Sequence, residues 1–337
     1  MPFIIQQTLL FAVPLMIVAL AGVFAERSGI INLALEGIMI FGAFIGVLFV
    51  RTVQEMPVFL EAFKAKDWVT LQMLELLAMA MAAAMGAVFS LLLSFASINL
   101  KADQTIGGTA LNLMAPALVL FLVRIIANQN TLQMTTGDAA SWFMLKKSTF
   151  GIDKKTDIGF LGETFIHKVY LATYICIILF IVLSIILYKT KFGLRLRACG
   201  EHPQAADSVG INVYKMRYAG VLISGLLGGL GGIVYITAGV SVWKFENGVA
   251  GFGFLALAVM IFGAWHPLKI ALAALLFGFF RALGNVYSGF DFMMALNIPS
   301  VVYNMLPDII SLVVLAFTSK KSRAPKAEGI PYDKGTR

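Results

Sequence analysis

The stretch LALEGIMIFGAF, Leu33–Phe44, is an apolar segment with one carboxylate in it, and it returns later as LALAVMIFGAW, Leu255–Trp265. The two copies share the string MIFGA. Each follows a polar break that contains glycine, ERSGIIN in the first case and ENGVAGFG in the second. Apolar pentapeptides also recur by chance in such a hydrophobic chain, so the order of the surrounding segments has to decide between chance and an internal repeat.

Long apolar runs continue on both sides of these two segments. Of the 337 residues, 59% are hydrophobic and 13% are charged, whereas a soluble domain carries about a quarter charged residues. Apolar runs of about 20 residues have the length of a membrane-spanning helix. We therefore predict an all-α polytopic membrane protein with about nine transmembrane helices, near 3–25, 29–50, 70–98, 109–128, 168–188, 218–238, 250–265, 268–287 and 299–318.

Basic residues decide the predicted orientation. The segment 189–217 and the tail 319–337 each contain six Lys and Arg residues, and basic residues close to a membrane favour the cytoplasmic side. Nine spans then place the N-terminus and the loops 51–67 and 129–167 outside the cell. The basic residues lie beside membrane segments, so topology and lipid headgroups account for the net charge of +8 better than nucleic acid does.

The predicted spans divide into two related halves. Residues 1–130 contain four spans, and residues 218–318 contain four that correspond to them and run in the opposite direction. Such an inverted-topology repeat is common among transporters and places the substrate path near the interface of the halves. The remaining parts are an extracellular loop, 129–167, a linking span with a cytoplasmic loop, 168–217, and the cytoplasmic tail, 319–337.

Asn32 and Glu36 interrupt the first of the two apolar segments. They lie four residues apart, on one face of a helix if the segment is regular, although Ser28-Gly29 indicates a broken start. A charged group inside the bilayer is unfavourable and usually faces protein or a water-filled cavity. One interpretation is that both residues line a conduit. The alternative is that Glu36 lies near the headgroups or caps a neighbouring helix, and for Asn112 a helix–helix hydrogen bond is the simpler interpretation.

No pattern in the chain indicates covalent chemistry. The nucleotide-binding pattern G-x-x-x-x-G-K-[ST] does not occur, so we do not expect the chain to bind ATP itself. The three histidines lie in loops or at span ends and form no metal-binding pattern. The glycines of Ser224–Tyr235 are best explained by close packing of helices through small residues. We therefore expect a substrate that is moved and not altered, with no cofactor or metal held by this chain.

The polar passage between the fifth and sixth predicted spans carries the pattern Glu201-x-x-x-Ala205-Ala206-x-x-x-Gly210. It predicts one short helix that carries the glutamate and the alanines and ends at the glycine. Small residues on such a helix permit close docking. The passage resembles the coupling segment of bacterial ABC transporter permeases, which docks on a separate ATPase subunit.

Other blocks extend this resemblance over the chain. ERSGIINLALEGIMIFGAFIGV, Glu26–Val47, looks like the second-span signature of the permeases for branched-chain amino acids, ribose and nucleosides. LKADQTIGGTALNLMAPAL, Leu100–Leu118, looks like the block that follows it, and Lys191–Asn212 is similar to the coupling loop of that family. PKAEGIPYDKG, Pro325–Gly335, is similar to tails of the nucleoside branch, which depends on a basic membrane lipoprotein.

The resemblance implies a permease subunit of an ATP-driven importer in the bacterial plasma membrane. Its expected partners are a cytoplasmic ABC ATPase that uses the ATP, a second permease subunit and an extracellular substrate-binding lipoprotein. Nucleosides are the first choice of substrate, and sugars or branched-chain amino acids are the alternative. The residues that would contact the ATPase are Glu201, Ala205, Ala206 and Gly210. The residues in the blocks that line the translocation path are Asn32, Glu36 and Asn112.

A hypothesis from another class is an ion-coupled secondary transporter. Such a protein also has inverted repeats and an intramembrane carboxylate, here Glu36. It needs no ATPase, and the loop 189–217 would then be an ordinary linker.

Overall fold

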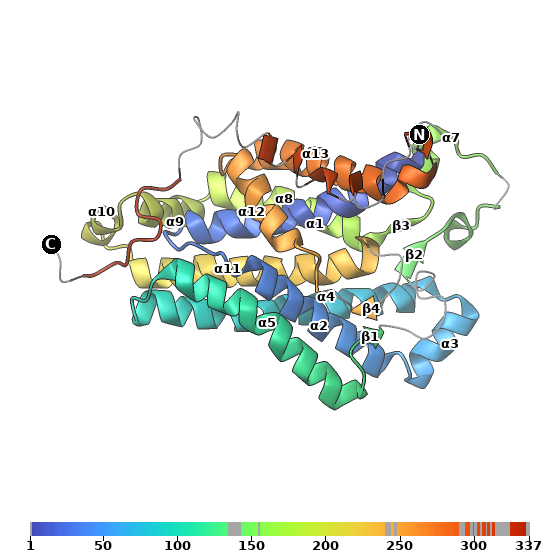
Figure 1. Ribbon diagram of the computed structural model, residues 1–337, viewed down its shortest axis with the longest axis horizontal. Coiled ribbons are helices and arrows are strands. Elements are labelled where there is room, and N and C mark those ends of the chain that lie inside the picture. The colour runs from blue at the N-terminus through green and yellow to red at the C-terminus, as the bar shows by residue number, and fades with distance from the viewer. Residues whose placement is uncertain are drawn as a thin grey trace.

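The computed structural model is almost entirely helical, and its main helices run side by side along the long axis of the molecule (Figure 1). The structure describes residues 2–133, 143–153, 156–239, 244–245, 248–289, 294–296 and 324–334, together with scattered residues between 299 and 313. Each main helix is apolar along most of its length and satisfies its own backbone hydrogen bonds, as a segment that crosses a bilayer must.

Seven helices of the described part are long and apolar enough to cross a membrane. Each of these helices overlaps a predicted span, and only α2 begins as much as six residues later than predicted. They are α1 (Pro2–Glu26), α2 (Leu35–Val53), α4 (Trp68–Ser94), α5 (Gln104–Ala127), α8 (Leu171–Lys189), α11 (Val213–Val234) and α13 (Pro267–Val286). The prediction of an all-α polytopic membrane protein is confirmed at this level.

Two predicted spans differ from what the structure contains. The span expected from residue 29 begins only at Leu35, because the chain first makes a turn in which Gly29 has φ +95°. The span expected at 250–265 is the 11-residue helix α12 (Phe252–Phe262). At 1.5 Å per residue α12 is about 16 Å long, which is shorter than the hydrocarbon core of a bilayer. Much of the ninth predicted span, 299–318, lies outside the described residues, so the count of nine stays a prediction.

Short elements gather at the two ends of the long helices. One end carries the N-terminus, α3 (Pro57–Ala65), the 3-10 turn η2 (Lys147–Phe150) and α7 (Gly159–Phe165) (Figure 1). Two small antiparallel sheets are also part of the structure: β1 (Leu132–Gln133) pairs with β4 (Lys244–Phe245), and β2 (Met144–Leu145) pairs with β3 (Val169–Tyr170). The other end carries α9 (Lys191–Glu201), α10 (Pro203–Ser208) and the C-terminus. The predicted outer loops and the predicted cytoplasmic segments thus lie at opposite ends.

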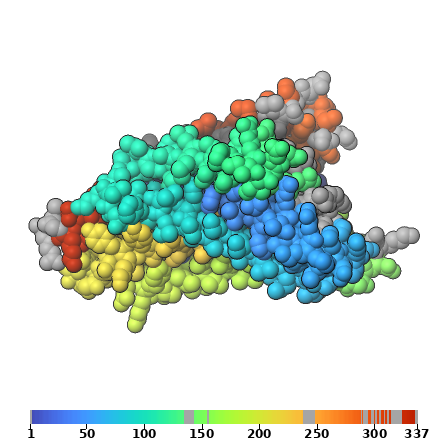
Figure 2. All heavy atoms as spheres, turned by 90° about the horizontal axis from the view of Figure 1, so that it is seen from below, coloured from blue at the N-terminus to red at the C-terminus, as the bar shows by residue number. Residues whose placement is uncertain are grey.

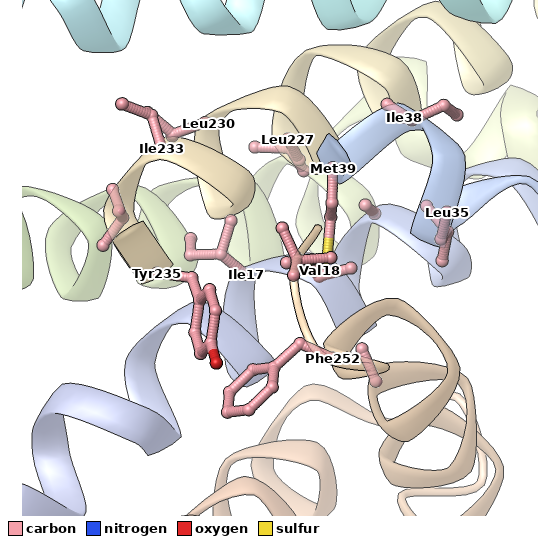
Figure 3. Close-up of a cluster of buried hydrophobic side chains, with 14 of the residues drawn as sticks. Ile17, Val18, Leu35, Ile38, Met39, Leu227, Leu230, Ile233, Tyr235 and Phe252 are labelled. Carbon is pink, nitrogen blue, oxygen red and sulfur yellow. The ribbon is translucent and has the colours of Figure 1, made fainter. Parts of the chain in front are cut away.

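Helix α11 forms the centre of the bundle. It packs against α1, α2 and α4, and its glycines allow this close approach, as the sequence predicts. A Cβ atom added to Gly42 of α2 would lie 2.3 Å from the Cα atom of Gly229 in α11. The buried side chains where α11 meets α1, α2 and α12 are drawn in Figure 3. Without a hydrophobic driving force between helices in lipid, such close van der Waals contact is a main source of helix association.

The packing pairs follow a regular pattern. Helix α1 packs against α12 and α13, whereas α11 packs against α2 and α4, and α1 and α11 pack against each other.

Helix α4 ends in a π-helical turn, η1 (Phe95–Asn99), and α11 ends in another, η3 (Tyr235–Gly239), while α13 ends in the 3-10 turn η4 (Tyr287–Gly289).

Candidate functional site

A cavity of about 900 Å³ lies between α2, α5 and the start of α12. Its volume is within the range of pockets that hold small molecules. Its walls are mostly apolar, with Leu113, Pro116 and Phe254 among the lining residues. The polar lining residues are Glu36, Thr109, Asn112, Arg124, Asn130 and Thr131. Apolar walls with a few polar groups are typical of sites for small polar molecules.

Glu36 lies in the first turn of α2, at the wall of this cavity. Its Oε1 atom accepts a hydrogen bond from the backbone N–H of Gly251 at 3.0 Å, and its Oε2 atom accepts one from Gly253 at 2.6 Å. These amides belong to the N-terminus of α12, where a negative charge is favoured by the helix dipole. The structure therefore combines two of the interpretations made from the sequence, because Glu36 caps a neighbouring helix and also lines the cavity.

Asn112 fixes the start of α2 from the opposite wall. Its Oδ1 atom accepts a hydrogen bond from the N–H of Gly37 at 2.8 Å, and its Nδ2 atom donates to the carbonyl of Leu33 at 2.5 Å. Both of its polar atoms thus hold the non-helical chain at the entry to α2. The predicted hydrogen bond between helices is confirmed, and Asn112 lines the cavity as well.

Asn32 has a different position from the one predicted. It lies in the turn before α2, so it does not share a helix face with Glu36, and it is fully buried. Its Nδ2 atom donates to the hydroxyl of Ser224 in α11 at 2.8 Å, and its Oδ1 atom accepts from the N–H of Ala34 at 3.1 Å. Asn32 and Glu36 share no helix face because the chain stays non-helical up to residue 34, in line with the broken start that Ser28-Gly29 indicated. Asn32 joins the turn to α11 and is not among the residues that line the cavity.

Both helix N-termini at the cavity are occupied by the chain's own side chains. Glu36 caps α12, and Asn112 binds an amide in the first turn of α2. In transporters of anions, free N-termini of broken helices point at the anionic group of the substrate. Here the amides of Gly37, Gly251 and Gly253 are already bound to Asn112 and Glu36, so what the cavity presents to a ligand is mainly side-chain groups.

Two arginines inside the spans are functional candidates that the sequence analysis did not single out. Arg124 lines the main cavity, and its Nε atom donates to Oδ1 of Asn130 at 2.9 Å. Arg281 of α13 lines a second cavity, of about 360 Å³, beside the start of α12, and its guanidinium lies 5.6 Å from the ring centroid of Phe252. A charged residue in an apolar span is the signal that could have identified both.

The predicted coupling segment consists of two helices and not one. Glu201 is the last residue of α9, whereas Ala205 and Ala206 belong to α10. His202 separates them with φ −149° and ψ 83°. The cause is Pro203, because proline disfavours the helical conformation in the residue before it and is well suited to the first turn of a new helix. The single-helix prediction is therefore wrong.

The four predicted coupling residues still lie close together at one end of the molecule. Ala205 is exposed, whereas Ala206 is buried. Gly210 has φ +83° and no neighbour within 4 Å of an added Cβ atom, so glycine is needed there for its conformation and not for space. The side chain of Glu201 binds Arg27, with 3.2 Å between Oε1 and Nη1.

Comparison with known proteins identifies the kind of transporter. Residues 4–318 match the family described as branched-chain amino acid transport system / permease component. The chain belongs to this family. The permease is 43% identical to the guanosine ABC transporter permease protein NupQ of Bacillus subtilis, over 99% of this chain and 97% of NupQ. It is 39% identical to the nucleoside ABC transporter permease protein NupC of Lactococcus lactis, over 98% of this chain and 96% of NupC.

A more distant relative comes from the same Bacillus strain as NupQ. The permease is 24% identical to the guanosine ABC transporter permease protein NupP, over 94% of this chain and 81% of NupP. No solved structure matches the permease. Its family and its seven apolar helices make it an integral protein of the plasma membrane and a transport subunit, not an enzyme.

Proposed function

We propose that this permease imports nucleosides, as one subunit of an ATP-driven transporter. The observation that carries the proposal is the 43% identity, over nearly the whole chain, to a permease named for guanosine. A second relative of similar coverage is named for nucleosides. The alternative substrates are sugars and branched-chain amino acids.

The chemistry of the main cavity supports a neutral ligand with polar edges. Apolar side chains such as Leu113 and Phe254 can pack on the faces of a base, and the amides of Asn112 and Asn130 can bind its edge or the ribose hydroxyls. A branched-chain amino acid brings a carboxylate, and three of the helix N-terminal amides that could bind it are already bound to Asn112 and Glu36. Arg124 in the lining could still pair with that carboxylate, so the names of the relatives favour a nucleoside over an amino acid. A sugar is neutral too, so only the names of the relatives favour a nucleoside over it.

The partners of the importer are proposed with it. They are a cytoplasmic ABC ATPase, a second permease subunit and an extracellular lipoprotein. The two guanosine permeases of Bacillus subtilis support a pair of different permeases. Helix α5 is on the surface of the molecule in Figure 2, with Ile106 70% and Leu113 74% exposed. Because α5 also forms one wall of the main cavity, the second permease would complete that wall.

We also propose that the two halves form an inverted repeat. In that arrangement α1 corresponds to α11, α2 to α12 and α4 to α13. The pairing of α1 with α13 then matches that of α11 with α4, and the pairing of α1 with α12 matches that of α11 with α2. The N-termini of α2 and α12 lie together at Glu36, which binds the amide of Gly251. From there α2 runs toward the end of the molecule that carries α3 (Figure 1). Helix α12 runs the other way, toward Glu26, which accepts a hydrogen bond from Trp265 just after α12. Substrate sites in such folds lie where the repeats meet.

In this scheme α9 and α10 form the coupling segment. Its exposed surface includes Ala205 and Val209, the latter 74% exposed, which suits a partner that covers it. The secondary-transporter hypothesis rested on the inverted repeats and on an intramembrane carboxylate such as Glu36. Glu36 is already bound to two amides, and the family is one of permease components, so that hypothesis has lost its support.

Uptake of radiolabelled guanosine by cells that express the full transporter tests the proposal. We expect competition from unlabelled adenosine and uridine but not from ribose or leucine. Cells that lack the partner ATPase, with the permease present, should show no uptake. Competition by ribose or leucine alone would refute nucleosides as the substrate, and uptake without the ATPase would refute the ATP-driven mechanism.

A further inference from the structure

The C-terminal residues 324–333 cross the end of the molecule that carries α9 and α10 (Figure 1). They form no regular helix beyond a turn at 326–329. Pro325, Ala327 and Tyr332 are buried, whereas the residues between them are half-buried or exposed. Figure 2 shows this segment in red, wedged between the start of α11 and the connection before α5. We call residues 324–333 the strap.

The strap is bound to the coupling segment. The backbone N–H of Ala327 donates to the carbonyl of Gly200 in α9 at 2.9 Å. Tyr332 belongs to a small buried cluster with Cys199 of α9, Ala206 of α10 and Val213 of α11. This cluster is separate from the main core of the bundle, and in it Tyr332 packs with residues of α9, α10 and α11.

The strap is also bound to the transmembrane core through Arg217 of α11. This side chain is 1% exposed, and its Nη1 atom donates to the carbonyl of Ile330 at 3.0 Å. Its guanidinium also lies 6.0 Å from the ring centroid of Tyr332. Within the described residues, its Nε and Nη2 atoms have no other hydrogen-bond partner. Arg217 therefore links the position of the strap directly to α11.

The coupling segment in turn contacts the turn between α1 and α2. A Cβ atom added to Gly200 would lie 2.4 Å from the carbonyl oxygen of Arg27, so the end of α9 lies directly on that backbone. Arg27 also binds Glu201. The same turn continues to Asn32, and helix α2 follows with Glu36 at the cavity wall. A continuous series of contacts therefore joins the coupling segment to the cavity.

We propose that the strap, through Tyr332 and Arg217, is a positioning element that holds the coupling segment against the α1–α2 turn, so that movements of the coupling segment reach the cavity. This inference rests on the proposed function, because it assumes that an ATPase moves the coupling segment. Without a docked strap, α9 and α10 move while the turn stays behind, and ATP is hydrolysed with little transport.

The test uses the complete transporter in proteoliposomes and measures guanosine uptake per ATP hydrolysed. We expect Tyr332→Ala to lower this ratio about fivefold or more, because about fivefold is the smallest effect that is typical of energetic coupling between two sites. Basal ATP hydrolysis should stay within about twofold of the wild type, because α9 and α10 keep their exposed surface. Tyr332→Phe keeps the ring and should restore the ratio. Ile330→Ala is the matched control, since that side chain is 55% exposed and only its carbonyl binds Arg217.

A second measurement reports directly whether the strap is docked. Cys199 is buried under Tyr332, and burial raises the pKa of its thiol to about 11, so it reacts slowly with maleimides. Mass spectrometry of maleimide-labelled protein should show faster labelling of Cys199 in Tyr332→Ala than in the wild type or in Ile330→Ala. Faster labelling with an unchanged uptake ratio would overturn the proposal, and so would unchanged labelling.

A milder variant covers the case in which Tyr332→Ala does not assemble. Gly329 has φ +76° in the turn of the strap, and Gly329→Ala strains that turn without removing a buried side chain. We expect Gly329→Ala to lower the uptake ratio and to speed Cys199 labelling, each by less than Tyr332→Ala does. Faster labelling with a normal uptake ratio would again refute the proposed role of the strap. If the wild type carries no guanosine, the nucleoside proposal fails instead, and Cys199 labelling with ligand-stimulated ATP hydrolysis still tests the strap.

Discussion

The cap that Glu36 places on α12 leads to a quantitative prediction for Glu36→Gln. Glu36 accepts two hydrogen bonds, from the amides of Gly251 and Gly253. Hydrogen bonds to a charged group contribute about 1.5–3 kcal/mol each. Glutamine keeps one oxygen acceptor but turns an NH₂ group toward the second amide. We therefore expect the variant to lose the equivalent of one charged hydrogen bond, or about 2 kcal/mol.

Thermal unfolding of the purified permease in detergent, without ligand, measures this loss. An unfolding entropy of about 2.1 cal/mol/K per residue gives about 0.7 kcal/mol/K for the 337 residues, so a loss of about 2 kcal/mol should lower Tm by about 3 °C. The matched control is Glu55→Gln, the same chemical change at an exposed residue just after α2, which should leave Tm unchanged.

The same assay separates a structural cap from a ligand contact. A cap lowers Tm in the absence of guanosine. A group that only contacts the ligand leaves Tm unchanged and raises the KM for uptake. If Glu36→Gln melts at the wild-type temperature, the hydrogen bonds to α12 do not carry the free energy assigned to them, and the reasoning is refuted.

Three further predictions concern packing, pH and the coupling segment. Gly42→Ala should destabilise the permease by about 1–3 kcal/mol, because overpacking against α11 forces the helices apart; Gly107→Ala, whose added Cβ atom would make only an ordinary contact at 3.8 Å from Cδ1 of Leu93, should not lower Tm. Burial raises the pKa of Glu328 to about 7 from 4.5, so the strap is most stable at low pH and loses that stability as the pH rises through about 7. Cys199 labelling in the wild type relative to Glu328→Gln should therefore increase between pH 5 and pH 8, and a constant ratio would contradict this. Gly210→Val should reduce co-purification of the ATPase, since a β-branched residue is strained at φ +83°; normal co-purification and uptake would refute a coupling role.

The long helices are predictable because a membrane span depends on local composition. The first predicted span, 3–25, corresponds to Pro2–Glu26, and the span 268–287 corresponds to Pro267–Val286. Twenty apolar residues in a row must satisfy their own backbone hydrogen bonds in lipid, and a helix does this with no help from distant parts of the chain. The packing role of the glycines near Gly229 was predictable for a similar reason, since small residues are what a tight helix interface needs.

The coupling segment shows where a local pattern was misjudged. The spacing from Glu201 to Gly210 predicted one helix, but His202-Pro203 divides it into α9 and α10. This signal is local and was present in the sequence. Proline at the start of a helix requires a break before it, and that rule outweighs the spacing of the alanines.

The sequence by itself therefore determined a helical membrane protein, the positions of its long helices and its resemblance to permeases. Only the tertiary structure decided what the polar residues inside the membrane do. Glu36 binds amides 215 and 217 residues away, and Asn32 binds Ser224, 192 residues away. A polar group buried in a bilayer must find a partner, and which partner it finds depends on how the helices pack, not on the residues next to it in the chain.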